Sequence, residues 1–157
     1  MPLLMVLLAL AVMPVQRPTD VVKWSAVAPA SPVQAGDVAV IKVIAKVQPG
    51  WKLYAIEQPP GGPVPLAFQT TAGSSFVISR KQIGAPRPKV QKKDENFSID
   101  TRYYENDAAF TLPVTVPPTT SPGSHQLPLE VTFQACGAEL CLRPFTQKLA
   151  VEITVRQ

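Results

Sequence analysis

Three segments of the chain alternate apolar and polar residues one by one, and this two-residue period constrains the fold more than any other feature. In residues 38–47 the odd positions are apolar, while Lys42 and Lys46 occupy even positions. The same alternation recurs over residues 127–133 and 149–155. Because successive side chains of a strand point to opposite faces, each segment predicts a strand that is buried on one face.

Shorter strand candidates, separated by turn-forming residues, lie between and before these segments. They cover residues 21–28, 52–56, 66–70, 76–80 and 108–116. The 18 prolines and 8 glycines favour short strands joined by turns. A chain of 157 residues has room for a single domain. We therefore predict an all-β fold, a sandwich of roughly seven or eight strands, from which residues 89–107 depart as a long charged excursion.

The first 16 residues carry no charge and have the character of an export signal. Their apolar run, from Leu3 to Val12, is too short to span a bilayer but matches the hydrophobic region of a signal peptide. We predict a signal peptide over residues 1–16 and an exported domain over residues 17–157, soluble once the leader is removed. The alternative interpretation of the leader is a buried N-terminal strand.

The two cysteines are separated by four residues and lie between two predicted strands. Antiparallel backbone brings opposed Cα atoms to about 4.5–5.5 Å, so a disulfide between Cys136 and Cys141 is sterically easy. A structural disulfide is one interpretation, although a loop this short contributes only about 2 kcal/mol. Because Cys136 continues the series of Thr132 and Gln134, we expect it to point away from the core, where a partner thiol can reach it. Such access favours thiol–disulfide exchange.

Other kinds of chemistry lack the residues that they need. Two cysteines, the single His125 and three methionines do not complete a metal site. No Ser/His/Asp set, pair of catalytic carboxylates or phosphate-binding glycine loop can be assembled. The net charge of +4 names no partner, and the basic residues between 80 and 93 lack the aromatic interleaving of a nucleic-acid site. We predict no cofactor, no metal and no nucleic acid.

The residues around the cysteines resemble the signature of a known family. Residues 132–144, TFQACGAELCLRP, are similar to the Y-Q-G-C-x4-C-[YF]-x-P signature of the periplasmic N-terminal domain of the DsbD thiol:disulfide interchange family. Residues 50–54, GWKLY, resemble the G-x-x-L-Y strand of that family. Residues 94–97, DENF, followed by 103–104 and 110–114, resemble its cap-loop region.

This resemblance implies an immunoglobulin-like β-sandwich in which a long cap loop shields the disulfide. Phe97 is the implied cap, which opens when a redox partner docks, and Tyr54 is implied beside the cysteine pair. An aromatic residue in a strand is equally often core packing, so both interpretations of Tyr54 remain. The chain departs from the family pattern at Ser98, a position where glycine often follows the cap aromatic, and at Leu142, which replaces an aromatic residue.

The resemblance also implies roles for the cysteines and for the cap loop. Cys141 is the implied nucleophile that attacks a target disulfide, and Cys136 resolves the mixed disulfide. Asp94 and Glu95 could exchange protons near the thiols, but we expect each to be solvated, as charged residues in polar loops usually are. Phe97 has no apolar neighbour in KKDENFS, so it must cover the disulfide or anchor the loop to the sandwich.

Two functions of different classes follow from these observations. The first is a monomeric periplasmic protein-disulfide reductase module. It would reduce oxidised periplasmic proteins and regain electrons from a DsbD-like membrane electron carrier or a thioredoxin-like domain, which we expect to be separate proteins. The alternative is a non-catalytic immunoglobulin-like binding or structural domain with an inert disulfide. A third possibility is an accessory domain that docks on a DsbD-like membrane protein without turning over.

Overall fold

Strands make up nearly all of the regular structure in the computed structural model, which describes residues 15–157. The predicted leader, residues 1–16, therefore lies outside the described residues except for its last two. Among residues 15–157, helical structure is confined to α1 (Pro18–Val21) and a short 3-10 turn, η1 (Arg80–Gln82). No helix among residues 15–157 has the length and apolar character needed to cross a membrane. The all-β prediction is confirmed.

The first sheet contains four antiparallel strands, and its inner face forms one side of the core. Its order is β1 (Val22–Val27), β3 (Val38–Val47), β9 (Asp107–Thr115) and β6 (Val77–Ile78). The alternation over residues 38–47 is reproduced, because Ala39, Ile41 and Val43 are buried whereas Lys42 is exposed. The register sets Val43 opposite Phe110.

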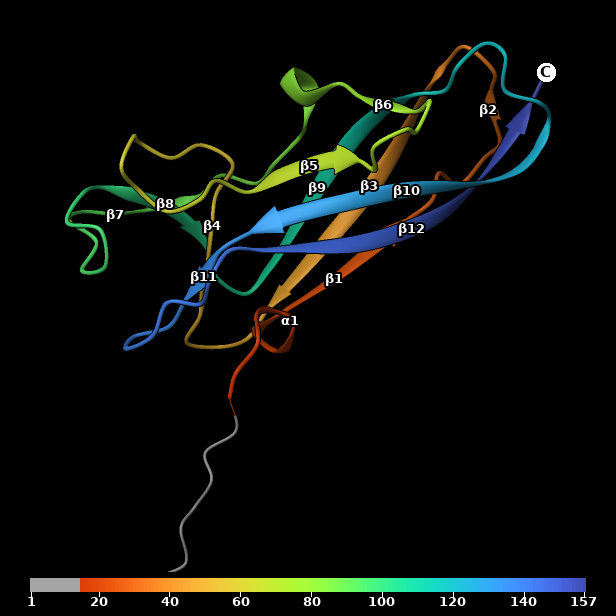
Figure 1. Cartoon of the computed structure of the whole chain (residues 1–157). Coiled ribbons are helices and arrows are strands. Elements are labelled where there is room, and N and C mark those ends of the chain that lie inside the picture. Colours follow the sequence, from red (N-terminus) through yellow and green to blue (C-terminus); the bar gives the residue numbers. More distant parts are fainter. Residues whose placement is uncertain (1–14) are drawn as a thin grey trace, which may run out of the picture.

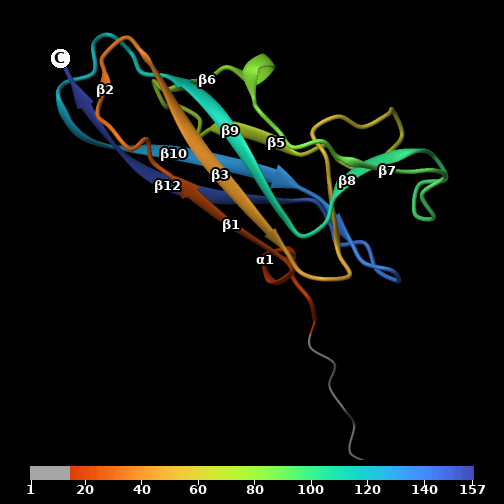
Figure 2. The same cartoon turned by 180° about the vertical axis from the view of Figure 1, so that it is seen from behind.

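The second sheet faces the first and completes the sandwich. Its order is β2 (Val33–Gln34), β12 (Phe145–Arg156), β10 (Gly123–Phe133) and β5 (Ala67–Thr70). Figures 1 and 2 show the two sheets as facing layers, with β10 and β12 in front in one view and β1, β3 and β9 in front in the other. Aromatic rings from both sheets meet between them: Trp24 lies 6.0 Å from Phe68 and 5.5 Å from Phe133 between ring centroids. This arrangement is an immunoglobulin-like sandwich.

A third, smaller sheet extends from one end of the sandwich (Figure 1). Its order is β11 (Ala135–Cys136), β4 (Lys52–Tyr54), β8 (Thr101–Tyr104) and β7 (Lys89–Gln91). The charged excursion expected over residues 89–107 contains two strands that were not predicted, which flank a loop over residues 92–100. These strands pair through their backbones while Lys89 and Arg102 stay exposed, so no apolar alternation marks them in the sequence.

The predicted strands are all present, with bounds that differ by a few residues. The segment 52–56 ends at Tyr54, and the segment 76–80 is reduced to Val77–Ile78 because Arg80 begins the 3-10 turn. Strands β2, β7, β8 and β11 were not predicted. Each has four residues or fewer, too short for a two-residue period to be recognised.

Candidate redox site

The cysteine pair occupies a tight hairpin at the end of the sandwich that carries the third sheet. Cys136 and Cys141 form a disulfide, and their Cα atoms lie 4.0 Å apart as an antiparallel bridge. The backbone N–H of Leu142 donates to the carbonyl oxygen of Ala135 at 3.0 Å, which closes the hairpin next to the disulfide. Trp51 packs beneath the turn, with ring atoms 3.5 Å from the position that a Cβ would take at Gly137.

The two cysteines differ sharply in exposure. Cys136 is 0% exposed, whereas Cys141 is only half-buried. The expectation that Cys136 points away from the core is therefore wrong. The burial alternation breaks at Cys136, because β10 ends at Phe133 and both Ala135 and Cys136 are buried in the next strand. Cys141 is thus the more accessible sulfur of the pair.

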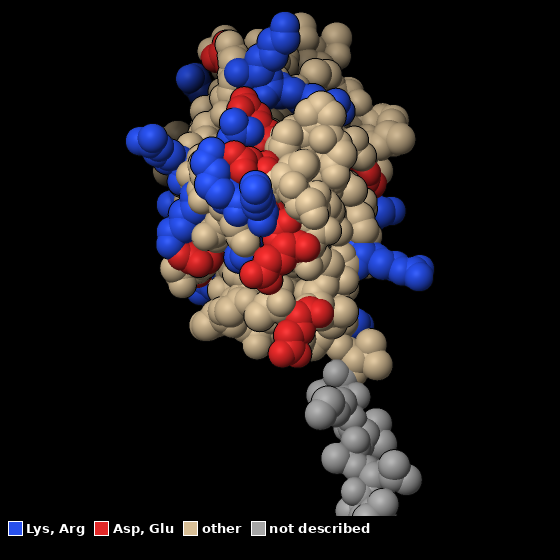
Figure 3. Space-filling view, turned by 90° about the vertical axis from the view of Figure 1, so that its left-hand side faces the viewer, with Lys and Arg blue, Asp and Glu red and all other residues tan. Residues whose placement is uncertain are grey.

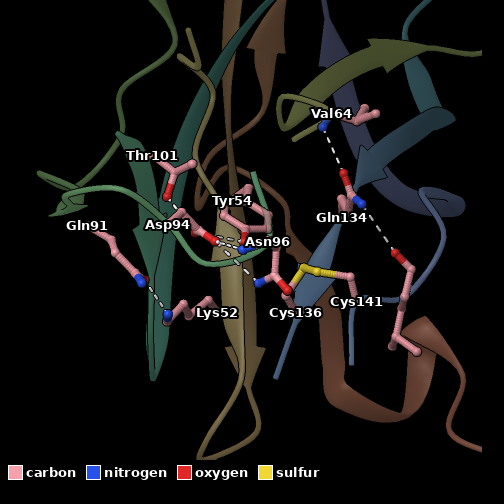
Figure 4. Close-up of a disulfide and its surroundings, with 11 residues drawn as sticks. Lys52, Tyr54, Val64, Gln91, Asp94, Asn96, Thr101, Gln134, Cys136 and Cys141 are labelled. Atoms are coloured by element: carbon pink, nitrogen blue, oxygen red, sulfur yellow. Dashed lines mark hydrogen bonds between the residues drawn. A yellow bond between two sulfur atoms is a disulfide. The ribbon is translucent and has the colours of Figure 1, made fainter. Parts of the chain in front are cut away.

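Gln134 lies between β10 and β11, and it links three segments around the hairpin. Its side-chain oxygen accepts a hydrogen bond from the backbone N–H of Val64 at 2.8 Å, and its side-chain nitrogen donates to the carbonyl oxygen of Leu142 at 3.4 Å (Figure 4). The strand after Gln134 pairs with β4 of the third sheet, where Cys136 stands opposite Lys52. This role of Gln134 was not predicted, because it depends on segments that are distant in the sequence.

Tyr54 lies on β4, the strand paired with the one that carries Cys136, and its side chain is fully buried. Its hydroxyl donates to the Oδ2 atom of Asp94 at 3.0 Å. The ring meets that of Phe97 edge to face, with centroids 5.5 Å apart. Phe97 is half-buried, and this contact anchors the loop, which is one of the two roles expected for it. Its role as a cover of the disulfide stays a prediction.

Asp94 is 0% exposed, and its carboxylate accepts hydrogen bonds from three residues. Oδ2 accepts from Tyr54 and from the Thr101 hydroxyl at 2.7 Å, and Oδ1 accepts from the backbone N–H of Asn96 at 2.9 Å and its side-chain nitrogen at 3.3 Å. The expectation that Asp94 is solvated is therefore wrong, whereas Glu95 is exposed as expected. The donors come from β4, β8 and the loop itself, a convergence that a polar loop sequence does not reveal.

These contacts shift the pKa values of both partners away from their ordinary values. Burial raises the pKa of Asp94, but the hydrogen bonds from Asn96, Thr101 and Tyr54 and the charge of Lys52 outweigh it, so the net pKa is lowered. Burial, followed by the Asp94 charge and hydrogen bond, raises the pKa of Tyr54 well above 10.0. Asp94 is therefore a charged acceptor and Tyr54 a neutral donor at neutral pH.

Residues 92–100, which we call the cap loop, fold around Asp94. The backbone N–H of Asp94 donates to the carbonyl oxygen of Ile99 at 2.7 Å. The backbone N–H of Ser98 donates to the backbone carbonyl oxygen of Asp94, also at 2.7 Å. Lys92 and Asp100 form an ion pair at 2.6 Å where the loop begins and ends. In the view of Figure 4 the Asn96 side chain lies between Asp94 and the disulfide, on the Cys136 side.

Charged side chains of both signs surround this end of the molecule, which faces the viewer in Figure 3. Lys89 pairs with Glu105 of the neighbouring strand region. The Lys52 ammonium bonds Gln91 and lies 5.3 Å from the centre of the Tyr103 ring. Lys52 is therefore engaged with the β7 and β8 side of the sheet. Within residues 15–157 no three His, Cys, Asp or Glu side chains are grouped to hold a metal ion.

Ser98 has a φ of 59°, the left-handed conformation that favours glycine. A left-handed non-glycine residue costs roughly 1–2 kcal/mol, and glycine loses about 0.5–1 kcal/mol more entropy on folding. We expect Ser98→Gly to raise the free energy of unfolding by up to about 1 kcal/mol, measured by urea denaturation. Ser98→Ala keeps the unfavourable φ and should give no gain. Equal stability of the two variants would contradict this account.

The lowered pKa of Asp94 predicts a loss of stability in acid. Its contribution is fully present above the unfolded value near 3.8 and is lost as the pH falls through the lower pKa of the folded state. Urea denaturation between about pH 6 and pH 2 measures this loss. Asp94→Asn should lose less stability over that range, although Asp20 and Asp100, whose pKa values are also lowered, still contribute. Parallel curves for the two proteins would show that Asp94 is not responsible.

The fold and the site together define an immunoglobulin-like domain with a cysteine pair at disulfide distance beside a loop at one end. The family model described as thiol:disulfide interchange protein DsbD, N-terminal, matches residues 19–153. The chain belongs to this family. The chain departs from the family pattern at Leu142, whose side chain is buried, and at Ser98, which has a left-handed backbone conformation.

A solved structure supports the fold. The N-terminal periplasmic domain of ScsB from Proteus mirabilis is similar with a TM-score of 0.58 and 18% identity, covering 89% of this chain and 49% of that chain. This chain therefore spans about half of that structure. The Salmonella SafD adhesin matches with a TM-score of 0.41 and 12% identity, over 87% of this chain and 99% of that one, and supports no statement about this protein. A comparison with curated protein sequences finds no match.

Proposed function

We propose that this protein is a thiol–disulfide exchange module that passes electrons from the Cys136–Cys141 pair to oxidised partner proteins. The observation that carries the proposal is the asymmetry of the pair. Cys141 is half-buried on an end hairpin, whereas Cys136 is fully enclosed. A disulfide that only stabilises the fold has no need of one accessible sulfur, but exchange requires one sulfur that meets a partner and a second that waits beside it.

In the proposed reaction the reduced protein attacks a partner disulfide with the Cys141 thiolate. A mixed disulfide forms and one partner sulfur leaves as a thiolate. The Cys136 thiolate then attacks the Cys141 sulfur, which closes the protein disulfide and releases the partner with both sulfurs reduced. Two electrons pass to the partner. Burial of Cys136 is compatible with this second step, because Cys136 needs to reach only Cys141.

The cap loop is proposed to protect the pair between encounters. Tyr54 and Asp94 hold the loop to β4, and Phe97 packs on Tyr54, so opening the loop would break contacts that are buried in the closed state. Glu95 is exposed and is proposed only as a surface residue of this region. Protection of this kind keeps other thiols away from the Cys136 side of the disulfide, whereas Cys141 stays open to partners.

Family membership supports a periplasmic location and partners of the thiol–disulfide class. Electrons would arrive from a DsbD-like membrane electron carrier or a thioredoxin-like domain and leave to oxidised periplasmic proteins. We propose that the module acts as a monomer without a cofactor, because the two sulfurs store the electron pair.

The equilibrium reduction potential of the Cys136–Cys141 pair tests the proposed function. The protein is equilibrated in a dithiothreitol or glutathione series, its thiols are trapped, and the reduced fraction is read by mass spectrometry. We expect a potential between roughly −270 and −120 mV, the range of known exchange proteins. A potential below about −300 mV, or thiols that react only after unfolding, would instead indicate an inert structural disulfide in a binding domain.

A further inference from the structure

An open cleft lies directly beside Cys141. It has a volume of about 810 Å³ and is bounded by two segments far apart in the sequence, residues 15–18 and 140–145. We call it the Cys141 cleft. Its volume is within the roughly 300–1,000 Å³ of pockets that hold ligands. Val15 and Gln16 belong to the predicted leader, whereas the other lining residues remain after a leader of residues 1–16 is removed.

The wall of the Cys141 cleft is mainly apolar. Leu140 and Phe145 line it and are 50% and 39% exposed, and Leu142 and Pro144 lie between them in the sequence. Leu140 precedes Cys141 directly, and both residues line the cleft. Neighbouring exposed apolar side chains around a hollow are typical of surfaces that bind another protein.

The disulfide is closed on one side and open on the other. Cys136 is 0% exposed and in the view of Figure 4 lies on the side of Asn96 and Asp94, whereas Cys141 is drawn on the opposite side. Cys141 lines the cleft and Cys136 does not. A partner sulfur that approaches Cys141 from the open side therefore brings the residues beside it into the cleft.

The charge of the lining indicates which partner residues fit. Arg17 and Arg143 both line the cleft, and no acidic residue does. Arg17 is paired with Asp20 at 3.3 Å, whereas Arg143 is exposed and forms no ion pair among residues 15–157. A carboxylate on the partner would complement Arg143.

We propose that the Cys141 cleft receives an extended segment of the partner protein next to the partner's cysteine, with an apolar side chain on Leu140 and Phe145 and an acidic side chain near Arg143. The proposal rests on the proposed function and names the partner sequence that this site selects. It places the selection on the open side of the disulfide, away from the cap loop.

Peptides that carry an activated disulfide test this selection. Each contains one cysteine joined to 2-thiopyridine. One peptide has leucine and glutamate beside the cysteine, and its matched control has serine and lysine at those positions. The Cys141 thiolate of the reduced protein attacks the peptide sulfur, forming the mixed disulfide and releasing 2-thiopyridone, whose absorbance gives the rate. Dithiodipyridine, which has no peptide, is the reference disulfide for every variant.

We expect the leucine–glutamate peptide to react about tenfold faster than its control, a difference of about 1.4 kcal/mol in barrier. The double variant Leu140→Ser, Phe145→Ser should reduce the ratio of the two peptide rates to about threefold or less. Each rate is first divided by the rate of the same variant with dithiodipyridine. Arg143→Glu should favour the lysine peptide. Val77→Ser is the matched control, because Val77 is 59% exposed on β6 and does not line the cleft; it should keep the wild-type preference.

The outcomes separate this proposal from the proposed function. Equal rates with both peptides, together with rapid reaction with dithiodipyridine, would overturn the cleft assignment and leave exchange intact. No reaction with dithiodipyridine would overturn both. Sedimentation experiments could instead detect a dimer that dissociates in the Phe145→Ser variant. That result would assign the cleft to a second copy of the chain and would also overturn the proposal.

Discussion

Protein with Cys136→Ala should stay covalently joined to its partners through Cys141. Without the second thiol the mixed disulfide has no internal route to resolution, so its yield should rise about tenfold or more over the wild type. The half-buried position of Cys141 allows the first attack, which does not require Cys136. Incubation of the reduced variant with a periplasmic extract, followed by non-reducing electrophoresis and mass spectrometry, measures the yield.

Cys141→Ala is the matched control for this experiment. It also has one remaining cysteine, but Cys136 is 0% exposed and should form few adducts unless the protein unfolds. Treatment with dithiothreitol should release every trapped partner, which identifies the bond as a disulfide. Equal trapping by both variants, or stronger trapping by Cys141→Ala, would reverse the assigned order of attack.

Asp94→Ala should lower the free energy of unfolding by about 3 kcal/mol. The substitution removes the acceptor for Tyr54, Thr101 and Asn96, and a buried polar group without a partner costs roughly 1–3 kcal/mol. It also frees the cap loop from β4, so dithiothreitol should reduce the disulfide several-fold faster. Urea denaturation of the oxidised protein gives the first quantity, and thiol trapping over time gives the second.

Two variants set the scale for this loss. Asp100→Ala removes an exposed carboxylate of the same loop, whose ion pair with Lys92 should contribute at most about 1 kcal/mol. Tyr54→Phe removes one donor to Asp94 and keeps the ring beside Phe97, so it should cost about 1 kcal/mol. If Asp94→Ala costs no more than Asp100→Ala, Asp94 does not anchor the cap loop.

The interpretation of the site from sequence was least accurate where burial depends on distant strands. Asp94 and Glu95 are neighbours in a charged loop, yet the first is enclosed and the second is exposed. The difference arises because donors on β4 and β8 reach Asp94 alone. Cys136 shows the same limit, because its expected orientation came from a burial alternation that does not continue past Ala135.

Local sequence determined much of this protein. The two-residue period fixes the long strands, since residues of one parity must be buried together. The four-residue spacing of Cys136 and Cys141 allows a disulfide within one hairpin, and the flanking residues carry the family signature. These features depend on neighbours in the chain and could therefore be predicted without coordinates.

Only the tertiary structure decided which sulfur is accessible, which acidic residue is buried and where the Cys141 cleft lies. After Gln134 the chain joins the third sheet, and this step encloses Cys136 and leaves Cys141 at the cleft. Asp94 is enclosed because β4 and β8 meet beside the cap loop. Each outcome depends on contacts between residues that are distant in sequence, and local patterns carry no information about which distant strands will pair.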